Sequence, residues 1–263
     1  MGEEMSCWRD KYDMVISIRS VVCRDRVPSL ERELARVGIE PDIRLWSVPS
    51  PFEFNAGERP GVRPVRSMAD RSRPGFLNSG LAHYRAWKTA LGLGAQRALI
   101  LEDDVRFLRD LDALRAVVGQ TPDRDICLYD LLKSGNEDAS AVRATLDARR
   151  LPESPLWAEP TERPCSFACY GATRAALAHL AGCVDGAYMG RWRLHIVDHY
   201  MHRQWLGDPP RIAIACAWPL ACIQRPFRTS PNNTTTVFNH GKLDAQLDWY
   251  ANGLGLDLDA YED

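Results

Sequence analysis

The chain lacks the features of a membrane-spanning or secreted protein. Its 263 residues contain no uninterrupted apolar run of about eighteen side chains, so no transmembrane helix is predicted. The opening segment, MGEEMSCWRDKYD, is acidic and has no apolar core of the kind found in secretory signals. These absences predict a cytoplasmic protein and leave open a peripheral contact with a membrane.

Cysteine pairs with metal-binding spacing are also absent. The chain has eight cysteines, and none of them forms a CxxC pair. The closest two, Cys165 and Cys169, have no histidine near enough in sequence to complete a zinc-finger pattern. We therefore expect buried free thiols, as is usual for a protein of the reducing cytosol.

The chain has no excess of positive charge. Its formal net charge is −2, which does not favour a nucleic acid as a partner. Lysine is scarce, so most of the basic residues are arginines. A composition of 45% hydrophobic and 26% charged residues is that of a globular protein that can bury a sizeable core.

Strands and helices are predicted to alternate along most of the chain. A strand at residues 14–18, a helix at 28–38 and a strand at 43–48 form the opening expected of a nucleotide-binding α/β sheet. Further strands are predicted at residues 98–101, 125–131, 165–170 and 212–217, with helices at 79–91, 173–181 and 198–205. No linker separates these elements, so we expect one α/β domain over residues 1–263 with a mostly parallel central sheet flanked by helices.

The most informative segment is a short strand that ends in three acidic residues. Residues 98–101 are continuously apolar, as expected of a strand that is buried on both faces. Glu102, Asp103 and Asp104 follow at its carboxyl end, where open α/β sheets bind ligands. Adjacent carboxylates favour a compensating cation, and hard oxygen ligands suit Mg²⁺ or Mn²⁺. The alternative is a solvated acidic turn.

Residues 49–74 interrupt the pattern of strands and helices. They are rich in proline and carry five arginines, which are Arg59, Arg63, Arg66, Arg71 and Arg73. This composition predicts a mobile loop. It is either a solvated surface loop or a lid whose guanidinium groups contact phosphate.

Five segments, in order along the chain, resemble glycosyltransferase family 25, which includes bacterial lipopolysaccharide glycosyltransferases and collagen hydroxylysine galactosyltransferases. GLAHYRAW at residues 80–87, followed by LEDD, resembles its SH…AW…LEDD block. The other four segments are VISIRSVVCRDR at 15–26, FACYGATRAALAHL at 167–180, IVDHY at 196–200, and WPLACIQ at 218–224 with Ser230.

The resemblance implies a GT-A-type fold and an inverting transferase that uses a UDP-sugar, with galactose or glucose as the hexose. A metal held by Asp104, with Glu102 or Asp103, would stabilise the charge that builds on the leaving diphosphate. If the segment is extended, Glu102 and Asp104 share one side and Asp103 faces away. His240 is a candidate third ligand, because a neutral imidazole can complete an oxygen-rich site. The alternative for His240 is a solvated tail histidine.

Five further residues are candidates for catalysis and donor binding. Asp198 matches the family's acidic position and is the candidate base for the acceptor hydroxyl; alternatively, it caps a helix. His83 is expected to contact the nucleotide or the sugar, or else to be a packed histidine bonded to backbone. Arg19, Arg24 and Arg26 follow the first strand in its exit loop, where one of them is expected to meet base or phosphate.

The expected acceptor is a hydroxyl of a glycan such as a lipopolysaccharide core. Two other acceptors stay open, a hydroxylated protein side chain and a hydroxymethylated DNA base. A catalytically inactive nucleotide-sugar-binding domain is the alternative of a different class, and the intact acidic triplet argues against it.

Overall fold

The computed structural model describes residues 7–21, 23–47, 74–130, 155–159, 167–189, 212–218, 220–224, 248, 251–252 and 256–261. The predicted helix at 198–205 and nearly all of the loop at 49–74 lie outside these residues. The described cysteines are free, and most of them are buried, as expected.

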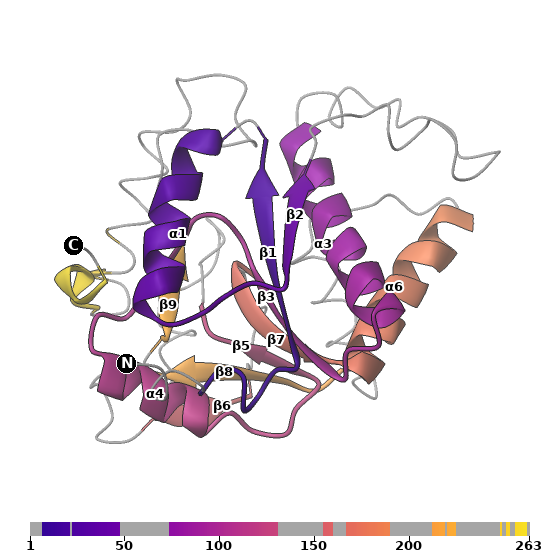
Figure 1. Cartoon of the computed structure of the whole chain (residues 1–263). Helices are drawn as coiled ribbons and strands as arrows, with labels where there is room; N and C mark the ends of the chain where they lie inside the picture. Colours follow the sequence, from indigo (N-terminus) through magenta and orange to yellow (C-terminus); the bar gives the residue numbers. More distant parts are fainter. Residues whose placement is uncertain are drawn as a thin grey trace.

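A seven-stranded mixed sheet forms the centre of the molecule (Figure 1). Its order is β2-β1-β3-β7-β5-β8-β6, and all of its strands except β7 and β6 run in one direction. The bounds are β1 Met14–Ser20, β2 Ile43–Ser47, β3 Arg97–Leu101, β5 Ile126–Leu128, β6 Leu156–Ala158, β7 Cys169–Thr173 and β8 Ile214–Trp218. The predicted α/β class with a mostly parallel sheet is confirmed at this level.

Helices cover both faces of the sheet. On one face, α3 (Pro74–Gly92) and α6 (Arg174–Met189) lie side by side, and on the other lie α1 (Val27–Arg36) and α4 (Leu111–Gly119) (Figure 1). The alternation of strand side chains explains these layers: Ile16 and Ile100 join the first core, whereas their neighbours Val15 and Leu99 join the second. Among the described helices, none is both long enough and apolar enough to span a membrane.

The chain leaves the main sheet directly after β3. A short strand, β4 (Val105–Phe107), pairs antiparallel with β9 (Cys222–Gln224) beside the end of β3. A 3-10 turn, η1 (Arg24–Arg26), leads from β1 into α1, and a second, η4 (Leu258–Ala260), lies near the C-terminus. The strands β4, β6 and β9 were not predicted, because three residues are too few to show a hydrophobic period. The nine-residue helix α4 was missed as well.

Several predicted boundaries were wrong, and two of them bear on the sheet. Arg19 was expected in the exit loop of the first strand, but β1 continues to Ser20 and the Arg19 side chain is buried. The strand expected at 165–170 is β7, which begins at Cys169 and runs antiparallel to its neighbours β3 and β5. The turn before β3 depends on Gly94, whose φ of 87° favours glycine.

Gly171 in β7 lies where no side chain fits. A Cβ at this position would be 2.0 Å from the hydroxyl of Tyr12, which is fully buried and hydrogen-bonded to Tyr129. Gly171→Ala should therefore lower the free energy of unfolding by about 1–3 kcal/mol, as overpacking does. The control is Gly182→Ala in α6, which meets no neighbour and should raise it by about 0.5–1 kcal/mol. Chemical denaturation measures both, and a Gly171→Ala variant as stable as the wild type would contradict the packing described.

Candidate functional site

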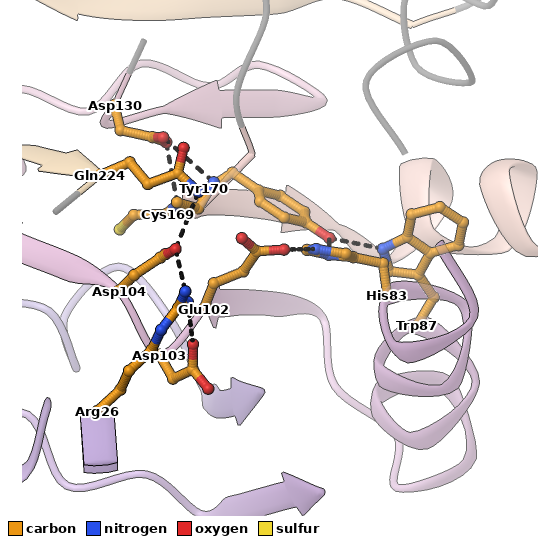
Figure 2. Close-up of polar contacts among 11 residues, drawn as sticks. Arg26, His83, Trp87, Glu102, Asp103, Asp104, Asp130, Cys169, Tyr170 and Gln224 are labelled. Atoms are coloured by element: carbon orange, nitrogen blue, oxygen red, sulfur yellow. Dashed lines mark hydrogen bonds and ion pairs between the residues drawn. The ribbon is translucent and has the colours of Figure 1, made fainter. Parts of the chain in front are cut away.

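Polar side chains from several strands meet at one edge of the sheet (Figure 2). The carboxyl ends of β1, β3 and β5 lie there together with the beginning of β7, because β7 runs in the opposite direction. Glu102, Asp103 and Asp104 follow β3, and Asp130 is the second residue after β5. Asp130 is buried and accepts hydrogen bonds from the backbone N–H groups of Ala168 (3.2 Å) and Cys169 (2.9 Å). It thereby holds the beginning of β7 against the end of β5.

Asp103 and Asp104 share one arginine. Nη1 of Arg26 donates to Oδ1 of Asp103 at 3.1 Å and to Oδ2 of Asp104 at 3.0 Å, and all three side chains are buried. The predicted arrangement, with Asp103 facing away from Asp104, is therefore wrong. Residues 103–104 form a turn after β3, and the alternation of an extended segment does not apply to a turn.

The two aspartates differ in how their oxygens are used. Both Asp103 oxygens are bonded, since Oδ2 accepts the backbone N–H of Ser20 at 2.6 Å. Oδ2 of Asp104 accepts from Arg26 and from Nε2 of Gln224 at 3.0 Å, whereas its Oδ1 is buried and accepts no hydrogen bond from the residues that the structure describes. A buried carboxylate oxygen without a donor is costly, so it marks a place for a ligand.

The charge balance of this edge is negative. Burial raises the pKa of Asp104 to about 7; Arg26 lowers it, and the neighbouring carboxylates Glu102 and Asp103 raise it further. One guanidinium thus pairs with two buried aspartates, and Glu102 adds a third carboxylate nearby. A divalent cation would relieve this excess, because it would replace the missing donor at Oδ1 and offset the remaining negative charge.

Glu102 points toward α3 rather than toward Arg26 (Figure 2). Its Oε1 lies 2.8 Å from Nε2 of His83, whose Nδ1 lies 2.9 Å from the hydroxyl of Tyr170. That hydroxyl also accepts a hydrogen bond from Nε1 of Trp87 at 2.8 Å. His83 is fully buried and both of its ring nitrogens are engaged, so a direct contact with a nucleotide would require these bonds to break.

The other two arginines lie beside an exposed tryptophan. Arg19 pairs with Glu31, and its guanidinium lies 6.0 Å from the ring centre of Trp46 at the end of β2. Arg24 is exposed in η1 and lies 5.9 Å from the same ring. The three arginine candidates therefore gather at the ends of β1 and β2, and of these Arg26 is the one that contacts the acidic pair.

Two candidates cannot be placed. Asp198 and His240 lie outside the described residues, so their roles stay predictions. Among the residues that are described, no three acidic, histidine or cysteine side chains stand close enough to form a metal site as they are. Asp103 and Asp104 fit a divalent cation by their oxygen donors and by the unbonded Oδ1, but Arg26 occupies the space between them.

Sequence reasoning missed three residues of this edge as site residues. Asp130 lies near the carboxyl end of the strand predicted at 125–131, much as Glu102 directly follows the strand predicted at 98–101, and that similarity was a usable signal. Gln224 and Tyr170 lie in segments of the family resemblance, but nothing local indicates that either side chain turns toward the acidic residues.

Comparison with known proteins adds no relative. No protein-family model matches the chain, and no curated protein matches its sequence.

Proposed function

We propose that the protein is a metal-dependent, inverting glycosyltransferase of the GT-A type that transfers galactose or glucose from a UDP-sugar to a hydroxyl group. The observation that carries the proposal is the unbonded, buried Oδ1 of Asp104 within an acidic sheet edge. The resemblance to glycosyltransferase family 25 and the α/β sheet support it.

The metal would be Mn²⁺ or Mg²⁺, with Asp104 as the main ligand and Glu102 as the other carboxylate. Its chemistry would be to offset the negative charge that develops on the leaving diphosphate. Arg19 and Arg24 lie at the ends of neighbouring strands, where a nucleotide bound at this edge would find them. Their guanidinium groups can donate two parallel hydrogen bonds to a phosphate.

Arg26 should compete with the metal. Because its Nη1 lies between Asp103 and Asp104, Arg26→Gln removes a positive charge from the place where a divalent cation is needed. We expect the nucleotide-free variant to bind Mn²⁺ at least about tenfold more tightly than the wild type, a gain of ~1.4 kcal/mol. Titration calorimetry measures this affinity. Arg24→Gln, from the same 3-10 turn but in contact with Trp46, is the matched control and should leave it unchanged. Equal affinities in all three proteins would contradict the competition.

Asp198 is proposed as the base that takes the proton from the acceptor hydroxyl. Asp198→Asn should lower the turnover of transfer by about 10²-fold or more, the scale of general-base loss, with little change in Mn²⁺ or donor binding. Steady-state kinetics and thermal unfolding together decide this. A variant that melts earlier but turns over normally would show that Asp198 caps a helix instead.

The acceptor is proposed to be a glycan, with a lipopolysaccharide core as the leading candidate. Hydroxylated protein side chains and hydroxymethylated DNA bases are the alternatives. A binding domain without activity would hold the same nucleotide sugar but release no UDP.

A panel of nucleotide sugars tests the proposed function without knowledge of the acceptor. Many transferases slowly hydrolyse their donor, so UDP should be released from UDP-galactose or UDP-glucose in the presence of Mn²⁺ and not with a chelator. Binding of a UDP-sugar without release, in the presence of all three classes of acceptor, would favour the inactive domain. Absence of both binding and release would contradict the proposal.

A further inference from the structure

A buried chain of polar side chains connects α3 to the acidic edge. His83 and Trp87 are one helical turn apart on α3, and both reach the hydroxyl of Tyr170 in β7 (Figure 2). All three side chains are almost fully buried, with exposed fractions of 0%, 1% and 0%. This series of hydrogen-bonded side chains ends at Oε1 of Glu102, whose side chain is only partly buried. It therefore runs from the core to the edge where the metal and donor are proposed to bind.

The positions of the hydrogens in this series of side chains follow from the groups at its two ends, the indole of Trp87 and the carboxylate of Glu102. The indole nitrogen of Trp87 can only donate, so the Tyr170 oxygen accepts from it. Among the described residues, the single hydroxyl hydrogen of Tyr170 then has one acceptor within reach, Nδ1 of His83. The ring proton of His83 must consequently lie on Nε2, from which it is donated to Glu102.

The opposite tautomer is disfavoured. If Nδ1 of His83 carried the proton, it would point at the Tyr170 oxygen, and the hydroxyl hydrogen of Tyr170 would lose its acceptor in the core. A buried donor left without a partner costs about 1–3 kcal/mol. Trp87, Tyr170 and the Glu102 carboxylate therefore favour the same tautomer of His83, the one that donates to Glu102.

We propose that Trp87, Tyr170 and His83 form a positioning relay that fixes the orientation of Glu102 and makes it, rather than Asp103, the carboxylate that acts with Asp104. This inference rests on the proposed function. Asp103 is less suited to that role, because its Oδ2 accepts the backbone N–H of Ser20 and so holds the end of β1. Residues that orient a metal ligand typically change metal affinity by about 10–100-fold when they are replaced.

Tyr170→Phe tests the relay, because it removes the hydroxyl and keeps the ring. NMR of histidine-labelled protein should show the Nε2–H tautomer of His83 in both proteins, because Glu102 still accepts from Nε2. The Nδ1 resonance of His83 should shift in the variant, because Nδ1 loses its hydrogen bond from Tyr170. Mn²⁺ affinity of the nucleotide-free variant should fall by about tenfold or more. Turnover should fall with it, while the KM for the donor changes little.

Tyr129→Phe is the matched control. Tyr129 is also fully buried, and its hydroxyl is also bonded to two side chains, Tyr12 and Thr121, but it packs in the core cluster on the opposite face of the sheet. This variant should lose stability without changing the Nδ1 resonance of His83 or the Mn²⁺ affinity. If Tyr170→Phe also loses only stability, the hydrogen bonds among Trp87, Tyr170 and His83 are only contacts of the core, and the inference is overturned.

A second pair of variants serves if Tyr170→Phe does not fold. His83→Gln retains an N–H that can donate to Glu102, whereas His83→Leu does not, so the glutamine variant should bind Mn²⁺ more tightly. Equal Mn²⁺ affinities would overturn the inference. A wild-type protein that binds no Mn²⁺ would refute the proposed function instead, and the NMR comparison would still decide whether Tyr170 is bonded to Nδ1 of His83.

Discussion

Replacing Asp104 with asparagine should abolish Mn²⁺-dependent transfer and, at about pH 8, stabilise the metal-free protein. Burial raises the pKa of Asp104 to about 7 from its usual 3.8, despite the opposing effect of Arg26. The folded state therefore binds a proton more strongly than the unfolded state. As the pH rises through the window between these two values, ionisation of Asp104 in the unfolded chain lowers the stability of the fold, and above pH 7 the full penalty is present.

An asparagine carries no charge and escapes this penalty. The thermal midpoint of Asp104→Asn should thus exceed that of the wild type well above pH 7, and the difference should shrink toward pH 4. Scanning calorimetry across this range, without metal, measures it. Asp112→Asn, at an almost fully exposed carboxylate of α4, is the control and should change neither stability nor transfer. Wild-type transfer that survives chelation, or a variant that is less stable above pH 7, would contradict this account of Asp104.

Glu33→Ala should be the most destabilising single change in α1. Glu33 is 2% exposed, and its carboxylate accepts from Arg106 at 2.8 Å, Arg36 at 2.9 Å and the backbone N–H of Phe107 at 3.1 Å. Arg106 is equally buried, and removing one partner of a buried ion pair costs about 3–5 kcal/mol. Because β4 begins directly after Asp104, this pair also fixes the chain where it leaves the acidic edge.

Urea unfolding measures the effect through the denaturation midpoint. Arg32→Ala, on the exposed side of the same helix, should stay within about 0.5 kcal/mol of the wild type and controls for the change in helix composition. A Glu33→Ala variant as stable as Arg32→Ala would show that the ion pair contributes little to the fold.

Local sequence signals were sufficient for the main elements of the sheet. The continuous apolar run before Glu102 predicted β3, because a strand covered by helices on both faces needs apolar side chains on both of its sides. The acidic residues were expected at its carboxyl end, and they lie there. The helix before β3 was also predicted, although it begins earlier, at Pro74.

The contacts within the site could not be predicted from local signals. Arg26 meets Asp103 and Asp104 across more than seventy residues of sequence, and Tyr170 meets His83 across more than eighty. Such pairs depend on the order of strands in the sheet, which hydrophobic periodicity does not specify. The prediction that Asp103 faces away from Asp104 failed for a different reason. It assumed that the strand continues at residues where the backbone turns.

The most direct test of the proposed function is a crystal structure with Mn²⁺ and UDP, with anomalous scattering collected at the manganese edge. The account predicts one Mn²⁺ ion bound by Oδ1 of Asp104 and by Glu102, in contact with the diphosphate, and Arg26 no longer between the two aspartates. UDP bound elsewhere, or an anomalous map without a peak at Asp104 while Arg26 still bridges Asp103 and Asp104, would contradict it.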